Sequence, residues 1–392
     1  MFERRRSLSS TKFIRSFNAV SILRTLYRKG SCSRVQLTET TQMSPSTVTR
    51  IISKLLEQEM ITRIGIGESI GGRKPEIFQL NYEKLYLVGV RMLRNQVDLA
   101  VADLKGKILR KREFQPYSLE PEALITEVAR EFELLLKDSS IQKDHILGLG
   151  LAIAGIVDNE NGILLRSVNL GWREVKIQDM LEKTLGVPVL LENDANAAAL
   201  AEFWFGCGKD VANLLYLKTD TGVGAGIIHE RNLFTGFRGM AGEIGHIPFM
   251  RQGHKCRCGL QGCLETYLYF FDVMRRYEAK TGLQLEDIDR LFRRALDGDN
   301  AAWDIVNEAA DALAIAVSFA NGLLDLDMVV IGGVWGSLGE EFLDMIRHKY
   351  RVIPEKSGLN REVFITHFSL GADCDLLGAV GLVINRWLAS PI

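Results

Sequence analysis

Residues 242–265 read GEIGHIPFMRQGHKCRCGLQGCLE, so two histidines are followed by three cysteines that fall within eight residues of one another. Three thiolates and an imidazole form a complete ligand set for a tetrahedral zinc ion. The sequence therefore predicts one Zn²⁺ ion per chain, held by His246, Cys256, Cys258 and Cys263. Because four protein ligands leave no open position, this zinc is expected to be structural rather than catalytic.

Two alternatives to this ligand set stay open at the level of sequence. His254 is a rival fourth ligand, although its position two residues before Cys256 would strain a common tetrahedron. Packed free thiols or a disulfide are the other alternative. The remaining cysteines, Cys32, Cys207 and Cys374, are scattered along the chain. This usage favours a metal site in a reducing cytoplasm over a disulfide framework.

On both sides of this segment the sequence alternates strands with helices. Strands are expected at residues 85–90, 97–102, 147–154, 214–218, 224–228 and 328–331, and helices at residues 121–137, 177–185 and 195–205. Such alternation predicts a mixed α/β core, and the length after residue 80 is enough for two lobes. No stretch of about 20 residues is free of charge, so no membrane span is expected.

Two short polar stretches lie in this α/β region. Residues 191–196 read LENDAN and join a strand to an alanine-rich helix. Polar side chains at the carboxyl end of a strand suit ligand hydroxyls, and Asp194 has the chemistry of a general base. Helix capping by Asn193 or Asp194 is the simpler explanation of the spacing. Residues 221–226 read TGVGAG, which is equally typical of a phosphate-binding turn and of a tight β-turn.

Charge is divided unevenly along the chain. The first 80 residues carry 14 Lys and Arg against six Asp and Glu, a net charge of +8, whereas the remainder carries 34 against 43, a net charge of -9. A basic head on an acidic body indicates a polyanionic partner at one end of the molecule. Docking of the head on the body would explain the charges equally well, so the fold of the head must decide between a polyanionic partner and internal docking.

The head has the pattern of a winged helix-turn-helix. A helix over residues 17–28 is followed by Ser33 and Gln36, which are spaced as a capping box, and then by Ser44 and Pro45, which suit the start of another helix. One face of that helix is apolar at helical spacing, and the other is polar and basic, so it can enter a major groove. The residues predicted to contact DNA from this face are Ser46, Thr47, Thr49, Arg50, Ser53 and Lys54.

Two extended stretches, residues 61–66 and 76–80, flank a glycine-rich tip that carries Arg73 and Lys74. This pattern predicts a wing whose cations reach phosphates or a minor groove. Recognition by a helix-turn-helix usually requires two heads related by a two-fold axis. We therefore expect a homodimer or homotetramer and a palindromic double-stranded DNA operator.

Taken together, the segment from Gly242 to Glu265, the Asn193-Asp194 pair and the basic winged head resemble the ROK family, named for repressors, open reading frames and kinases. The resemblance covers essentially the whole chain. It implies two lobes of the ribonuclease-H-like, actin-like kinase type with a sugar between them. The head is similar to that of the repressor branch, which includes xylose, glucose and N-acetylglucosamine regulators.

The resemblance also implies a sugar site. The matching residues are Asn169, Asn193, Asp194, Glu243, His246 and Glu265. Their side chains offer several charged or bidentate hydrogen-bond partners, as a polyhydroxylated ligand requires. His246 would bind zinc through one ring nitrogen and meet a sugar hydroxyl with the other, so the metal would position the pocket.

Several positions depart from the kinases of the family. The glycine-rich phosphate hairpin expected after the first strand is replaced by the bulky residues from Arg91 to Asn95, and a glycine of the second phosphate turn is replaced by Asp220. Bulky side chains keep the backbone away from phosphate, and a carboxylate repels it. We therefore predict a protein that is not an enzyme, in which Asp194 is a vestigial base.

The resulting prediction is a cytoplasmic repressor of carbohydrate-metabolism genes. Residues 1–80 are expected to form the DNA-binding domain and residues 81–392 the effector domain, with one lobe at about 81–195 plus 375–392 and the other at about 196–374. The effector would be a sugar, a sugar phosphate or a transport protein of the phosphotransferase type. The alternative is a bifunctional ATP-dependent sugar kinase that also binds DNA.

Overall fold

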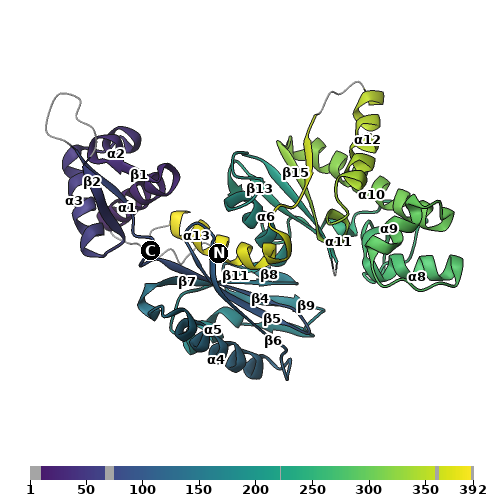
Figure 1. The fold of residues 1–392 in the computed structure, drawn as a ribbon, viewed down its shortest axis with the longest axis horizontal. Helices are drawn as coiled ribbons and strands as arrows, with labels where there is room; N and C mark the ends of the chain where they lie inside the picture. Colours follow the sequence, from purple (N-terminus) through teal and green to yellow (C-terminus); the bar gives the residue numbers. More distant parts are fainter. Residues whose placement is uncertain (1–9, 67–74, 221, 358–361, 390–392) are drawn as a thin grey trace.

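A computed structural model describes residues 10–66, 75–220, 222–357 and 362–389. It contains a small head and two larger lobes, each built on its own β-sheet (Figure 1). The winged helix-turn-helix and the two-lobed α/β body predicted from the sequence are both confirmed. No helix among the described residues is long and apolar enough to cross a membrane.

Among the described residues, the head contains three helices and a three-stranded sheet. Its elements are α1 (Ser10–Lys29), β1 (Ser31–Ser33), α2 (Arg34–Thr41), α3 (Pro45–Glu57), β2 (Ile61–Ile66) and β3 (Glu76–Leu80), with the strands in the order β1-β3-β2. The capping box is present, because the Ser33 hydroxyl accepts from the backbone NH of Gln36 and the Gln36 side chain accepts from the backbone NH of Ser33. Ser44 caps α3 through the NH of Thr47.

The first lobe contains a five-stranded sheet in the order β11-β7-β4-β5-β6. Its strands are β4 (Tyr86–Met92), β5 (Val97–Asp103), β6 (Ile108–Phe114), β7 (Ile146–Ile153) and β11 (Val189–Asn193). Helices α4 (Pro121–Ser139) and α5 (Ile177–Leu185) pack on one face, and α13 (Cys374–Ala389) packs on the other. A small sheet of β8 (Ile156–Asp158), β9 (Ile163–Ser167) and β10 (Trp172–Val175) adjoins it.

The second lobe has a five-stranded sheet in the order β14-β13-β12-β15-β16. The strands are β12 (Leu214–Thr219), β13 (Val223–His229), β14 (Asn232–Leu233), β15 (Met328–Gly332) and β16 (Phe364–His367). Alternate residues of β12 enter different cores: Leu214 and Tyr216 face α6 (Asp194–Trp204), whereas Leu215 and Leu217 join the core of α10 (Asn300–Leu324). The remaining helices of this lobe are α7 (Glu265–Leu268), α8 (Phe270–Thr281), α9 (Ile288–Leu296), α11 (Gly333–Gly336) and α12 (Glu340–Ser357).

Helices α6 and α13 lie side by side between the two sheets (Figure 1). Small residues allow this close contact. A Cβ atom at Gly378 of α13 would come within 2.1 Å of the Ala197 carbonyl oxygen of α6, and one at Gly150 of β7 would come within 1.9 Å of the Ala379 carbonyl oxygen. Only glycine fits at these two positions without moving the backbone.

The head packs directly on the far ends of these two helices. The ring of Tyr27 in α1 meets the ring of Trp204 in α6 edge to face, with centroids 5.5 Å apart. Nε of Arg24 in α1 donates to the Leu388 carbonyl oxygen of α13 over 3.0 Å. One hydrophobic core includes Leu26 of the head together with residues of both helices, so the head and the body share their packing.

Candidate functional site

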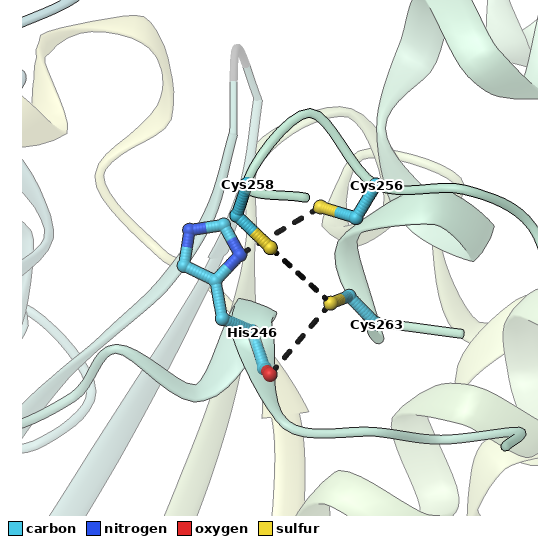
Figure 2. Close-up of side chains that lie close together, drawn as sticks. All are labelled: His246, Cys256, Cys258 and Cys263. Atoms are coloured by element: carbon cyan, nitrogen blue, oxygen red, sulfur yellow. Dashed lines mark hydrogen bonds between the residues drawn. The ribbon is translucent and has the colours of Figure 1, made fainter. Parts of the chain in front are cut away.

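The predicted zinc ligands come together in space (Figure 2). His246 ends the 3-10 helix η2 (Ile244–His246), and the three cysteines lie in the loop that leads to α7. The four potential ligand atoms are all within 4.8 Å of one another. Gly259 and Gly262 turn the loop around the cluster with positive φ angles of 96° and 73°.

The distances within the cluster fit a tetrahedral metal site. Sγ of Cys258 is 3.7 Å from Sγ of Cys263, and Sγ of Cys256 is 3.8 Å from Nδ1 of His246. Zinc–sulfur bonds of about 2.3 Å in a tetrahedron place two sulfurs about 3.8 Å apart. Nδ1 of His246 faces the sulfurs, whereas the other ring nitrogen points away from them (Figure 2). The donor set and its spacing are therefore those of a zinc site.

The rival ligand His254 lies outside the cluster. Its ring packs against the ring of Tyr267 with a centroid distance of 5.3 Å, and its Nε2 is 3.5 Å from a guanidinium nitrogen of Arg276. The disulfide alternative is not seen either, because Cys256, Cys258 and Cys263 are all free.

A pocket of about 380 Å³ opens beside the cluster. It is lined from both lobes, and it contains every residue predicted for the sugar site: Asn169, Asn193, Asp194, Glu243, His246 and Glu265. Three cations that the sequence did not single out also line it, namely Arg166, Lys218 and Arg257. Its volume is within the usual range for small-molecule sites.

Asn193 and Asp194 occupy the junction between β11 and α6. Asn193 caps the helix, because its Oδ1 accepts from the backbone NH of Ala195. Its Nδ2 donates to the Gly155 carbonyl oxygen. The capping role favoured by the sequence is therefore present. Asp194 is the first residue of α6, and burial together with Asp375 and Asp220 raises the pKa of its carboxyl, against the opposing effect of Lys218.

The two glutamates of the pocket lie on either side of the metal cluster in the sequence. Burial and the nearby Glu265 raise the pKa of Glu243, and His246 opposes this rise. Glu265 begins α7, and its Oε1 is 3.6 Å from a guanidinium nitrogen of Arg257, which stacks on Tyr269. These carboxyl groups offer strong acceptors for ligand hydroxyls.

Lys218 is the main feature of the pocket that sequence reasoning missed. It is the penultimate residue of the buried strand β12, and its Nζ is 2.6 Å from Asp375, 3.2 Å from Asp220 and 3.7 Å from Asp194. Burial alone would lower the pKa of Lys218, but the three carboxylates hold it well above its ordinary value. A lysine inside an otherwise apolar strand is the sequence signal that could have indicated this cluster.

The sequence profile of the ROK family matches residues 87–386, which make up most of the chain. The chain belongs to the ROK family. Within the head, residues 16–65 match the profile of the MarR family.

Relatives of this ROK protein include both repressors and kinases. A putative xylose repressor of Caldicellulosiruptor sp. (strain Rt8B.4) is 28% identical over 96% of this chain and 98% of its own length. A glucokinase of Halalkalibacterium halodurans is 32% identical over 76% of this chain and 94% of its own. The crystal structure of a ROK family transcriptional regulator, a homologue of E. coli MLC, superposes with a TM-score of 0.85 at 24% identity, covering 96% of this chain and 97% of that one.

In this ROK protein, the side chains that depart from the kinase pattern contact other parts of the chain. Arg91 at the end of β4 forms an ion pair with the fully buried Asp98, and its Nη1 donates to the Ala372 carbonyl oxygen over 3.1 Å. Arg94 donates to the Asn169 carbonyl oxygen over 3.3 Å. The Asp220 carboxylate lies against Gly333, where an added Cβ would be 2.5 Å from its Oδ1.

Helix α3 has one buried face and one exposed face. Its buried face consists of Val48, Ile51, Ile52 and Leu55. All but one of the side chains proposed to contact DNA are exposed, and Thr47 is half-buried; the set is Ser46, Thr47, Thr49, Arg50, Ser53 and Lys54. Arg73 and Lys74 lie outside the described residues, as does Thr221 of the glycine-rich turn.

Proposed function

We propose that this ROK protein is a transcriptional repressor of carbohydrate-metabolism genes whose operator affinity depends on an effector bound in the ROK domain. The observation that carries the proposal is the combination, in one chain, of a winged head with a basic recognition helix and a pocket rich in carboxylates. The likeness to a protein named as a putative xylose repressor, which extends over nearly the full length of both chains, supports it.

In the proposed mechanism the head binds DNA and the pocket binds a sugar or sugar phosphate. Asp194, Glu243 and Glu265 accept hydrogen bonds from ligand hydroxyls, and His246 lines the same pocket. A bound Zn²⁺ ion would cross-link the loop from His246 to Cys263 and so hold these groups in place. A transport protein that binds the body is an alternative effector.

The division of labour follows the proposed domain limits. Residues 1–80 bind DNA and residues 81–392 bind the effector, with residues 81–195 and 375–392 in one lobe and residues 196–374 in the other. A homodimer or homotetramer would place two recognition helices on a palindromic operator in the cytoplasm. An effector changes operator affinity only if it binds the two head arrangements with different affinity.

Sugar phosphorylation is the second candidate function, because the similar glucokinase is 32% identical. The contacts of Arg91 and the carboxylate of Asp220 argue against it. Nucleotide phosphates placed beside Gly333 would meet the Asp220 carboxylate, and like charges at such distances repel strongly in a partly buried site. We therefore expect no phosphoryl transfer from ATP to D-glucose, D-xylose or N-acetyl-D-glucosamine.

A thermal-shift screen tests the proposed pocket directly. We expect at least one of D-xylose, D-glucose, N-acetyl-D-glucosamine and their phosphates to raise the melting temperature, because a ligand that binds only the folded state stabilises it. ATP with Mg²⁺ should leave it unchanged. A kinase assay on the same sugars completes the test, and turnover that disappears in the Asp194→Asn variant would establish the kinase instead.

The Arg50→Ala variant tests the recognition helix. We expect its affinity for the operator to fall by about 5- to 150-fold, the range set by loss of a good base contact worth about 1–3 kcal/mol. Fluorescence anisotropy with a duplex selected by the wild-type protein from a random pool measures this change. Lys183→Ala, which removes an exposed cation from α5 of the body, is the matched control and should bind as the wild type does. Equal losses in both variants would contradict the placement of the DNA-binding face.

A further inference from the structure

Two helices lead from the pocket to the head. Helix α6 begins at Asp194, which lines the pocket, and ends at Trp204, whose ring contacts Tyr27 of the head. Helix α13 begins beside the pocket at Cys374 and ends next to Leu388, whose carbonyl oxygen accepts from Arg24 of the head. Because packed helices move as rigid elements, a displacement at their first turns reaches the head with little loss.

Lys218 binds the first turns of both helices at once. Its Nζ donates to both carboxylate oxygens of Asp375, the second residue of α13, over 2.7 and 2.6 Å. The same ammonium is 3.7 Å from Asp194, the first residue of α6. Lys218 and Asp375 are 7% and 8% exposed, so water screens their interaction very little. The strand that carries Lys218, β12, belongs to the second lobe, whereas α13 covers the sheet of the first.

A ligand in the pocket would interact with one of the carboxylates that Lys218 also faces. Lys218 faces three carboxylates, Asp194, Asp220 and Asp375, so one positive charge is shared among three negative ones. A ligand hydroxyl that donates to Asp194 supplies this carboxylate with another partner and leaves more of the ammonium to Asp375. Occupancy of the pocket therefore changes how firmly β12 is tied to the start of α13.

We propose that Lys218 is the positioning residue that couples occupancy of the pocket to the orientation of the DNA-binding head, acting through Asp375 and α13. The inference rests on the proposed control of operator binding by a sugar. It assigns to Lys218 a role separate from contact with the ligand.

The start of α13 has other supports that keep it folded without Lys218. Arg91 of β4 donates to the Ala372 carbonyl oxygen, and Lys111 of β6 forms an ion pair with Asp373 at 2.8 Å. Both contacts tie the segment before α13 to the sheet of the first lobe rather than to the pocket. Asp375→Asn, which keeps the size of the side chain and removes its charge, therefore changes the link to Lys218 while leaving the helix anchored.

Operator affinity with and without sugar measures the coupling. The full-length protein is titrated with a labelled duplex selected by the wild type from a random pool, with saturating D-xylose, D-glucose or N-acetyl-D-glucosamine and without sugar. In the wild type we expect at least one sugar to change the Kd by about 10-fold or more, within the range typical of allosteric coupling. In Asp375→Asn the change should fall below about 3-fold, although sugar affinity, measured by calorimetry, stays close to that of the wild type.

Asp373→Asn is the matched control, because it removes an ion pair two residues earlier that faces β6 instead of the pocket. It should retain the full response to sugar. Lys218→Met should lose the response as Asp375→Asn does, and the double variant should be no worse than either single variant, as expected for two members of one contact.

The outcomes separate this inference from the proposed function. A wild type whose operator affinity is unchanged by all three sugars, and a thermal-shift screen without a hit, would overturn both. A wild type that responds, together with an Asp375→Asn variant that responds by the same factor, would overturn the role of Lys218 and leave the repressor assignment intact.

Discussion

Substitution of Cys258 with serine is expected to reduce the affinity for Zn²⁺ by more than about 100-fold, because loss of a group that only orients a metal ligand already costs about 10- to 100-fold. Cys258 is exposed, so its replacement removes a ligand without opening a cavity in the core. Metal content per chain, measured by mass spectrometry after dialysis, gives the primary result. The melting temperature should fall at the same time, since a metal bound only by the folded state stabilises it.

Loss of the metal should also weaken sugar binding. His246 lines the pocket and belongs to the cluster, so the loop that carries it is held less firmly when the cluster cannot close around an ion. Cys207→Ser is the matched control. Cys207 lies away from the cluster, with its thiol 3.2 Å from a Glu202 carboxylate oxygen, and a serine hydroxyl can make the same hydrogen bond. A Cys258→Ser protein with a full complement of zinc would show that the ligand assignment is wrong.

Asp194→Asn is expected to weaken binding of the effector sugar by about 10- to 150-fold, because hydrogen bonds to charged groups contribute about 1.5–3 kcal/mol. The substitution keeps the shape of the side chain and removes the charge that a ligand hydroxyl would meet at the start of α6. Isothermal titration with the sugar that stabilises the wild type measures the change.

The control for Asp194→Asn is Asp158→Asn. Asp158 ends β8 and accepts from the backbone NH and the side-chain amide of Asn161, outside the pocket. Its replacement should leave sugar affinity unchanged. An Asp194→Asn variant that binds the sugar as tightly as the wild type does would remove Asp194 from the ligand-binding groups.

Local rules predicted much of the structure. The capping box at Ser33 and the Ser44 cap of α3 were predicted correctly, because capping depends on residues that are close in the sequence. The grouping of His246 with three cysteines was predicted for the same reason, since Cys256, Cys258 and Cys263 are near neighbours in one loop.

Features that depend on distant residues or on weak patterns were missed. Strand β6, which reads ILRKREF, has no clear alternation of apolar residues, and the strands of the small sheet, from β8 to β10, have at most five residues each. Lys218 was overlooked because its main partner, Asp375, is 157 residues away in the sequence. Only the tertiary fold brings this pair together.

The hydrophobic core shared by the head and the body limits how the head can be oriented on DNA. Leu26 of the head packs in one cluster with Trp387 and Leu388 near the end of α13, so the head is not joined to the body by a flexible linker alone. The orientation of the head is therefore set by the body, and in particular by α13. A small tilt of α13 would move the recognition helix through a longer arc. In the proposed dimer, two recognition helices would have to enter successive major grooves, so even a small displacement would weaken operator binding.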